Sequence, residues 1–385
     1  MGTIRLQQDR LKWASQAAAA AWGAFDVQLV IYASLLAGMG LLMAYTNSYE
    51  AGVSPLASDS TFARGLVWAG LAIIAFLVAA VFDYRWLKTF AWPLYFVNLG
   101  LLVLSLAIGT GVGGTARWVT IAGMQFQFSE LAKVLMAVVL ANWMSSRESR
   151  VSGLLTIVGA AALIAPPIVL VAMQPDLGTS LVFGAMLMGT LFISGASIRW
   201  LSVAAAAIVA AIPFAWTYVL RDYQKQRLIS FLDPTADPQG SGYHVIQSMI
   251  AVGSGGLFGK GLTNGTQNQL DFLPVQSTDF VFSILAEELG FVGAIVVFLL
   301  FAALIWRILL AAWHSEDAFG LAFAGAIASM IIFQVLVNVG MTIGIMPVTG
   351  IPLPFITHGG ASLISIALGL GVLQSINLRQ VRPKW

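Results

Sequence analysis

Three carboxylates lie in or beside one apolar stretch of the chain, residues 277–290 (STDFVFSILAEELG). Asp279 opens the stretch, and Glu287 and Glu288 follow within it. A charged side chain in an apolar helix is costly, so it usually has a partner or a function. A carboxylate at a membrane surface can act as a general base toward a hydroxyl group, so Asp279 is the candidate catalytic residue. The alternative is that Asp279 sits in the first helical turn, capped by Ser277 or Thr278, and only complements the helix dipole.

Glu287 and Glu288 lie too far along the helix to act together with Asp279. At about 1.5 Å per residue they are roughly 12–13 Å from it. Adjacent residues differ by about 100° around a helix, so at most one of the two shares the face of Asp279. We expect a buried structural pair with Arg, Lys or backbone partners, and a proton relay is the alternative.

A second group of charges precedes the middle of the chain. Glu130 and Lys133 are spaced i, i+3 and share one helix face, which predicts a salt bridge. Lys133 could also attract a phosphate. Arg117, after a run of glycines, is a second candidate anion ligand. The alternation in RWVTIAGMQFQF predicts a partly ordered surface segment there. Asp176 is expected to cap a helix.

The elements that position these residues are membrane helices. The chain has 385 residues, of which 59% are apolar and 9% charged, against roughly a quarter charged in soluble domains. We therefore predict an all-α, polytopic fold in one integral membrane domain, residues 1–385. Ten apolar stretches are long enough to span a bilayer: 27–46, 65–82, 89–110, 129–144, 151–173, 177–196, 199–220, 280–306, 319–346 and 359–377.

The distribution of Lys and Arg predicts the orientation of these helices. With ten spans both termini share a side, and that side carries 12 of the 19 Lys and Arg residues. The segments 1–26 and 379–385 are then cytoplasmic, and 221–278 is one large extracytoplasmic loop between helices seven and eight. Within it, the spacing of Val245, Ile246, Met249, Ile250 and Val252 predicts a short amphipathic helix at the membrane interface. The glycines of 253–261 permit positive φ and close approach to a ligand, or else form a flexible hinge.

Several functions are disfavoured by composition. A net charge of +2 argues against a nucleic-acid partner. The chain has no cysteine, so thiolate catalysis and cysteine metal sites are excluded. The three histidines, His244, His314 and His358, are far apart, which argues against a histidine metal cluster, and no metal ligands are predicted.

A set of linked segments resembles the SEDS family, the shape, elongation, division and sporulation proteins of bacterial cell-wall synthesis. In chain order these segments are TARWVTIAG, FSELAK, QPDLGTSLVF, GSGYHVIQSMIAVGSGGLFGKG, NGTQNQLDFLP, STDFVFSILAEELGFVG and MPVTGIPLPFITHGGASL. NGTQNQLDFLP is similar to the elongation, RodA-like branch. The chain departs from the family pattern at Phe128, at Val275-Gln276-Ser277 and at His358, and none of these changes removes a motif carboxylate.

This resemblance implies a peptidoglycan glycosyltransferase that polymerises lipid II on the outer face of the bacterial cytoplasmic membrane. It also implies a class B penicillin-binding protein as the transpeptidase partner, within the elongation machinery. By resemblance Asp279 is the essential carboxylate. The expected substrate-binding residues are Arg117, Glu130, Lys133, Arg221, Lys260, Gln269 and Thr278. Positive charge at the leaving pyrophosphate would come from some of the basic residues, or from a divalent cation such as Mg²⁺ or Mn²⁺.

Two other functions remain open from the sequence. Ten helices with intramembrane acids also suit a lipid II flippase or another lipid transporter, with Glu287 or Glu288 carrying protons. A non-catalytic scaffold that only anchors its partner is the third possibility, and it predicts that Asp279 can be replaced freely.

Overall fold

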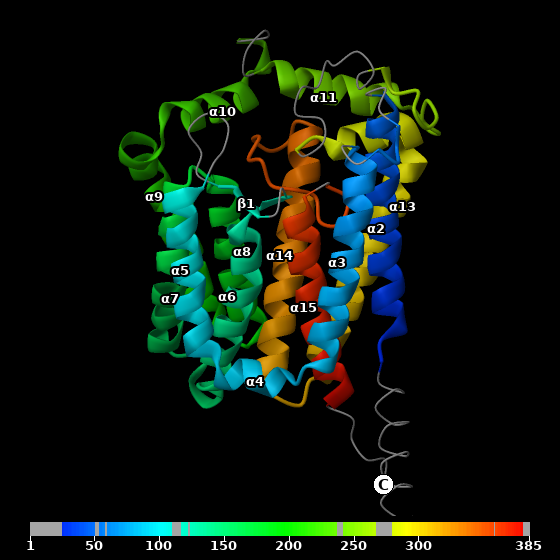
Figure 1. The fold of residues 1–385 in the computed structure, drawn as a ribbon. Helices are drawn as coiled ribbons and strands as arrows, with labels where there is room; N and C mark the ends of the chain where they lie inside the picture. The colour runs from blue at the N-terminus through cyan, green and yellow to red at the C-terminus, as the bar shows by residue number, and fades with distance from the viewer. Residues whose placement is uncertain are drawn as a thin grey trace, which may run out of the picture.

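A computed structural model describes residues 25–50, 54–57, 60–109, 117–121, 124–236, 242–266, 279–357 and 359–379. Long helices run side by side through this part of the chain, and a layer of shorter helices lies across one end (Figure 1). The long helices are α2 (Val27–Glu50), α3 (Thr61–Val81), α5 (Ala91–Ile108), α6 (Phe128–Ser145), α7 (Leu154–Met173), α8 (Leu177–Ile193), α9 (Ile198–Phe214), α13 (Val281–His314), α14 (Ala318–Thr342) and α15 (Gly360–Arg379).

The predicted all-α membrane fold is confirmed. Among the described residues, nine helices are long and apolar enough to cross a membrane, and the apolar helix α8 has 17 residues. Each of the ten predicted stretches coincides with one of the long helices. The exception to the all-helical pattern is a short antiparallel pair, β1 (Val119–Ile121) and β2 (Met124–Phe126), in the segment predicted to be partly ordered.

The largest boundary difference is at the cytoplasm-facing end predicted for α13. The sequence placed this end at residue 306 because Arg307 follows, whereas the helix continues to His314. Arg307 is accommodated because its guanidinium forms an ion pair with Asp26, just before α2, at 2.8 Å. Helix α9 also differs from its predicted stretch, 199–220. The α-helix ends at Phe214 and continues as one π-helical turn, Ala215–Val219.

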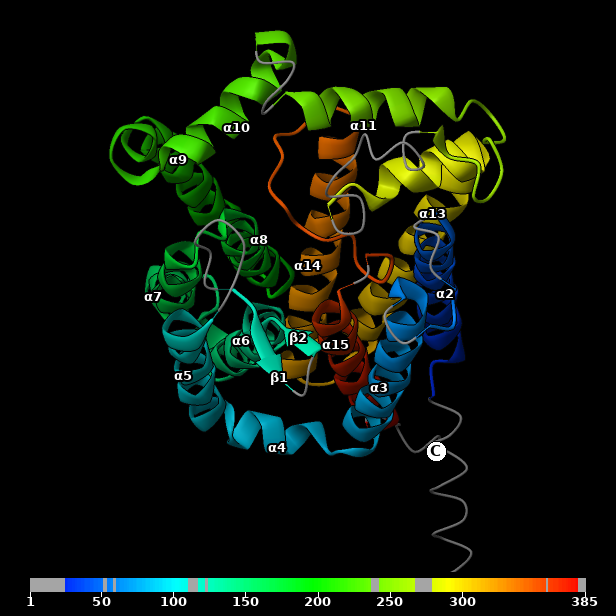
Figure 2. The same ribbon diagram turned by 45° about the horizontal axis from the view of Figure 1, so that its top comes forward.

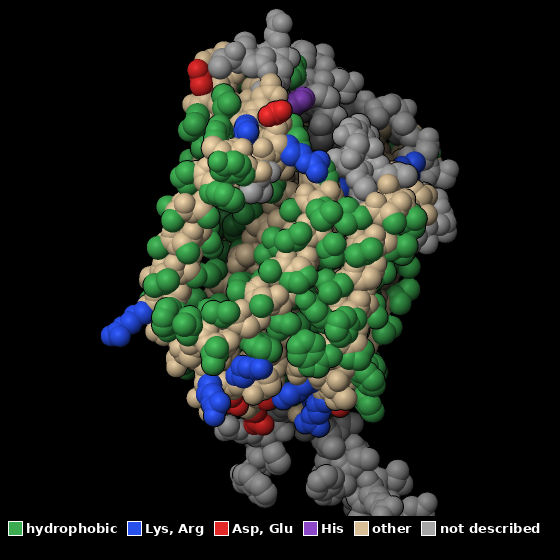
Figure 3. Space-filling model, turned by 90° about the vertical axis from the view of Figure 1, so that its left-hand side faces the viewer, with side chains coloured by type: hydrophobic (Ala, Val, Ile, Leu, Met, Phe, Trp, Pro, Cys, Tyr) green, Lys and Arg blue, Asp and Glu red, His purple; other side chains and the backbone are tan. Residues whose placement is uncertain are grey.

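The centre of the bundle is formed by α6, α14 and α15, which are mostly buried, whereas α9 is almost wholly exposed. α14 packs against α6, α8 and α13, and α15 packs against α3. The outward faces of the helices are apolar, and Figure 3 shows a hydrophobic band with charged side chains gathered toward its two ends. This arrangement satisfies the backbone inside each helix and keeps most charges out of the hydrocarbon.

The segment between α9 and α13 forms a layer over one end of the bundle. α10 (Asp222–Leu232) and α11 (Tyr243–Ser254) lie across the long helices rather than along them (Figures 1 and 2). The predicted amphipathic helix is thus confirmed as α11, whose buried face includes Val245, Ser248 and Ala251. Ser248 anchors it by donating to the backbone oxygen of Thr342 at the end of α14, at 2.7 Å.

The glycine-rich segment after α11 packs directly on α13. α13 is interrupted at Gly290 (φ 67°, ψ −166°), and the backbone there pairs with the incoming segment. Lys260 N donates to Glu287 O at 2.9 Å, and Phe291 N donates to Gly256 O at 2.9 Å. The predicted positive φ is confirmed at Gly256 and Gly259 (57° and 78°). The close approach is made to α13, so these glycines fix the segment in place.

Replacing Gly290 by alanine should destabilise this junction. An alanine would need an unfavourable positive φ, and its Cβ would overlap Gly259 N and lie 2.7 Å from Leu257 O. We expect Gly290→Ala to lower the free energy of unfolding by about 2–4 kcal/mol. Gly70→Ala is the matched control, because nothing lies within 4 Å of a Cβ there. Thermal unfolding in detergent measures both, and equal stability of the two variants would contradict the assignment.

Candidate active site

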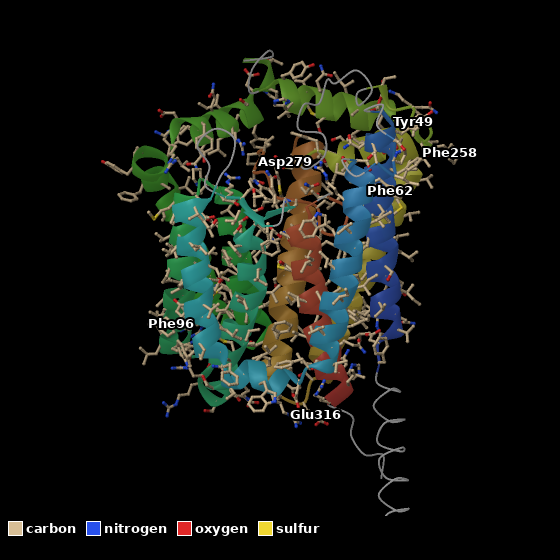
Figure 4. All side chains as sticks on the ribbon, in the orientation of Figure 1. Tyr49, Phe62, Phe96, Phe258, Asp279 and Glu316 are labelled. Carbon is tan, nitrogen blue, oxygen red and sulfur yellow. The ribbon has the colours of Figure 1, made fainter. Side chains whose placement is uncertain are left out.

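Asp279 lies in the turn that leads into α13. Helix α13 begins at Val281 with Phe280 as its N-cap, so the expectation that Asp279 occupies the first helical turn is wrong. Asp279 is positioned through a hydrogen bond to its own backbone oxygen rather than as part of a helix cap. Asn338 on α14 donates to Asp279 O at 3.1 Å and to Ile351 O at 2.8 Å. Asn338 therefore ties Asp279 to the segment that follows α14. Figure 4 shows Asp279 near the end of the bundle covered by α10 and α11.

Arg227 and His244 belong to the same neighbourhood, and both come from the covering layer. A Cβ placed on Gly350, whose φ is +74°, would lie 3.4 Å from Asp279 Oδ2 and 4.0 Å from Arg227 Nη1. Arg227 Nη1 donates to the backbone oxygen of Val348 at 3.4 Å. The guanidinium of α10 and the carboxylate before α13 thus flank one glycine.

His244 is held in its neutral form by this setting. Burial lowers the pKa of His244, Arg227 lowers it further, and Asp279 acts in the opposite direction. The net shift is downward from the ordinary value of 6.5, so the imidazole is neutral at pH 7. Its Nδ1 is buried with no hydrogen-bond partner among the described residues. The cation beside Asp279 is therefore Arg227 rather than His244.

Glu130 and Lys133 form the predicted salt bridge at the start of α6. Lys133 Nζ lies 2.8 Å from both carboxylate oxygens of Glu130, and both side chains are almost completely buried. An ammonium group has three donors, and the described residues supply acceptors only from this one carboxylate. The pair is thus a fixed, desolvated charge group at the same end of the bundle as Asp279.

A polar network connects this end of α6 with α8. Asp176 caps α8, as predicted, by accepting from Thr179 N at 3.0 Å. It also accepts from Gln127 Nε2, just before α6, at 3.1 Å. Arg117 donates from Nε to Gln174 O at 3.0 Å, beside the same turn. Arg117 therefore lies beside the start of α8.

The segment after α14 joins the two groups. A Cβ on Gly178, in the first turn of α8, would lie 2.8 Å from Thr349 O. Thr349 precedes Gly350, which contacts Asp279. Residues 349–351 therefore run from the capped start of α8 to the candidate catalytic carboxylate.

The other residues that were singled out from the sequence have different positions and partners. Lys260 Nζ is bound by Glu287 Oε1 at 2.6 Å and by Thr266 Oγ1 at 2.7 Å, so Glu287 has the structural partner that was expected. Glu288 is also fully buried. Arg221 is exposed at the start of α10, where its backbone N donates to Gln224 Oε1 at 2.9 Å. Gln269 and Thr278 lie outside the described residues.

Arg227 is the residue that the sequence did not single out. In the sequence it is one of several basic residues of the long polar segment. Its role depends on α10 folding back over the bundle, and no local pattern predicts that. The signal that the sequence offered was the i, i+4 spacing of Tyr223 and Arg227. In the structure the guanidinium carbon of Arg227 lies 5.9 Å from the centroid of the Tyr223 ring.

Several known proteins are similar to this chain in sequence. The chain is 42% identical over 313 residues to the peptidoglycan glycosyltransferase MrdB of Escherichia coli (strain K12), which covers 81% of this chain and 84% of that protein. It is 31% identical to the peptidoglycan glycosyltransferase RodA of Treponema pallidum (strain Nichols), across 93% of this chain and 98% of that one.

Solved structures agree with these sequence relatives. A chain from a peptidoglycan synthase complex, described for its coordination of polymerization and crosslinking, superposes with a TM-score of 0.78 and 31% identity, covering 93% of this chain and 99% of that one. The rod shape determining protein RodA of Thermus thermophilus superposes with a TM-score of 0.69 and 28% identity, covering 94% and 99%. Residues 27–381 match the cell cycle protein family named for FtsW, RodA and SpoVE, and the chain belongs to that family.

Proposed function

We propose that this protein is a peptidoglycan glycosyltransferase that polymerises lipid II into β-1,4 glycan strands during cell elongation. The names of its E. coli and T. pallidum relatives support this activity. The observation that carries the proposal is the placement of a carboxylate and a cation beside one glycine at one polar end of an apolar bundle. Asp279, before α13, and Arg227, on the covering helix α10, flank Gly350 there.

Asp279 acts as the general base in this proposal. Lipid II carries an α-linked sugar pyrophosphate and the product has β bonds, so the reaction inverts the anomeric carbon. Asp279 accepts the proton of the acceptor's 4-hydroxyl as that oxygen bonds to the donor's anomeric carbon. The bond to undecaprenyl pyrophosphate breaks, and the electron pair leaves with the pyrophosphate. Because the pKa of His244 is lowered from 6.5, its imidazole is uncharged at pH 7 and does not serve as a proton-donating acid beside Asp279.

The leaving pyrophosphate requires positive charge. Arg227 is suited to this task because it lies beside Asp279, and Lys133 because its ammonium is fixed by Glu130. Arg117 and Arg221 remain candidates, whereas Lys260 is engaged by Glu287. A divalent cation is the other source of charge. The described residues contain no group of three His, Asp or Glu side chains that could hold it.

The proposal includes an orientation and partners. We infer ten spans, counting the 17-residue helix α8, with both termini in the cytoplasm and Asp279 on the extracytoplasmic face. The excess of Lys and Arg in the predicted cytoplasmic segments supports this orientation. A class B penicillin-binding protein, working with the elongation machinery, is the proposed transpeptidase. The similarity to a chain of a peptidoglycan synthase complex supports such a partner.

A lipid II flippase is the alternative function. It would need an intramembrane acid that is free to carry protons. Glu287 accepts from Lys260 and from Thr266 N and Oγ1, which makes it a structural anchor for the glycine-rich segment. This arrangement argues against Glu287 as the proton carrier that a flippase would need.

Replacing Asp279 by asparagine should remove the base and preserve the fold. Asparagine keeps the size and the hydrogen-bonding capacity of the side chain, and the Asn338 contact is made with the backbone. We expect a loss of roughly 10²–10⁴-fold in polymerisation rate. Asp222→Asn, an exposed acid on α10, is the matched control and should retain activity. Both rates are measured by lipid II incorporation, and wild-type activity in Asp279→Asn would remove the general-base role.

Arg227 should contribute through its charge at the pyrophosphate. We expect Arg227→Gln to lower the polymerisation rate by roughly 10–100-fold, and Arg227→Lys to recover part of the loss. Lys225→Gln, on the same helix, serves as the control for a general charge effect. If the two glutamine variants are equally active, Arg227 has no specific role in the reaction.

The Glu130–Lys133 pair should affect stability and activity differently. Lys133→Met leaves a buried carboxylate without its cation and should lower the free energy of unfolding by about 3–5 kcal/mol. Adding Glu130→Gln removes that charge and should restore most of the stability. Polymerisation should remain low in the stable double variant, because the ammonium is still missing. Full activity of the double variant would show that the pair is only structural.

A further inference from the structure

A pocket of about 240 Å³ lies between α5, α6 and α7, at the end of the bundle opposite Asp279. Its lining residues are Ala91, Trp92, Val139, Asn142, Trp143, Ser146, Arg147 and Leu163. One wall is therefore apolar, and the other carries an amide, a hydroxyl and a guanidinium. None of these residues takes part in the proposed reaction.

The guanidinium of Arg147 is held in place by its neighbours. Its central carbon lies 3.2 Å from the centroid of the Trp143 ring, which is a cation–π contact. Trp143 is itself fixed, because its Nε1 donates to Thr156 O on α7 at 2.9 Å. The ring packs against Gly159, where a Cβ would overlap it. Arg147 is thus oriented before any ligand arrives.

Arg147 also has unused hydrogen-bonding capacity. The one hydrogen bond that its side chain makes within the described residues goes from Nη1 to Ser146 Oγ at 3.0 Å, and no described carboxylate pairs with it. A guanidinium carries five N–H donors in a planar fork that fits phosphate oxygens. Charge complementarity therefore favours an anionic ligand with a phosphate group.

The surroundings identify the source of that phosphate as a lipid. α4 (Tyr84–Thr89) lies flat at this end of the bundle (Figure 1), and it exposes Trp86 next to Phe90 with stacked rings 5.8 Å apart. Exposed tryptophan and basic residues together are typical of the headgroup region of a membrane. Lys and Arg side chains also gather at the lower edge of the face seen in Figure 3.

We propose that this pocket binds an anionic phospholipid of the cytoplasmic leaflet. Arg147 binds the lipid phosphate with help from Asn142 and Ser146. The first part of an acyl chain lies against Ala91, Val139 and Leu163. The leaflet assignment rests on the orientation given with the proposed function, whereas the lipid chemistry rests on the pocket and on the surface around it.

Native mass spectrometry of the full-length protein tests the proposal without an activity assay. The protein is exchanged into equal amounts of dioleoyl phosphatidylglycerol and dioleoyl phosphatidylcholine, and the lipid that remains bound is measured. We expect the wild type to retain phosphatidylglycerol selectively. Arg147→Gln should lower that retention by roughly fivefold, as expected for one basic residue at a membrane surface. Arg199→Gln, an exposed arginine on α9 away from the pocket, should leave retention unchanged.

Two further arms distinguish a lipid site from a site for free phosphate and from a general charge effect. Leu163→Phe fills the apolar wall without changing charge, so it should also lower retention. An excess of inorganic phosphate should not displace the lipid, because it lacks the acyl chain. The proposal is overturned if phosphate displaces the lipid, if both lipids are retained equally, or if the two glutamine variants behave alike. Because catalysis is not measured, inactivity toward lipid II would leave this result intact.

Discussion

The cost of a charge in an apolar medium is the constraint on which this structure depends. With 59% apolar residues and 9% charged ones, the chain has few charges, and in the part that the structure describes several buried carboxylates are held in ion pairs. Asp26 binds Arg307, Glu130 binds Lys133, and Glu287 binds Lys260. The first and third pairs join separate segments to α13, whereas Glu130 and Lys133 lie on the same helix. Removing one partner of a buried pair would leave the other charge unpaired at a cost of about 3–5 kcal/mol.

The same constraint concentrates the chemistry at one end. The starts of α6, α8 and α13 lie there, and α11 packs on α13 and α14. Asp279 is joined to the covering layer through Asn338, Gly350 and Arg227, while Lys260 is used to hold the glycine-rich segment against the break at Gly290. The charged residues that position the backbone, such as Lys260, are thus different from those that can bind a substrate, such as Arg227. The opposite end carries a different polar group, in which Arg147 is fixed over Trp143.

Local relationships could be predicted from the sequence, and long-range ones could not. The spacing of Glu130 and Lys133 predicted their pairing because three residues bring two side chains to one helix face. The cap at Asp176 and the amphipathic α11 were predictable for the same reason. The pairing of Lys260 with Glu287, and the approach of Arg227 to Asp279, depend on how distant segments fold over each other. Asp279 itself was found because a carboxylate beside an apolar run is rare, although its exact place before α13 was not.

The most direct test is whether the purified protein makes glycan. The protein would be combined with the proposed class B penicillin-binding protein, whose transpeptidase site is inactivated, and supplied with lipid II in vesicles. We predict long strands that a β-1,4-specific muramidase digests to disaccharide units. A stable complex that forms no polymer, yet moves lipid II across the vesicle membrane, would contradict the account and establish a transporter.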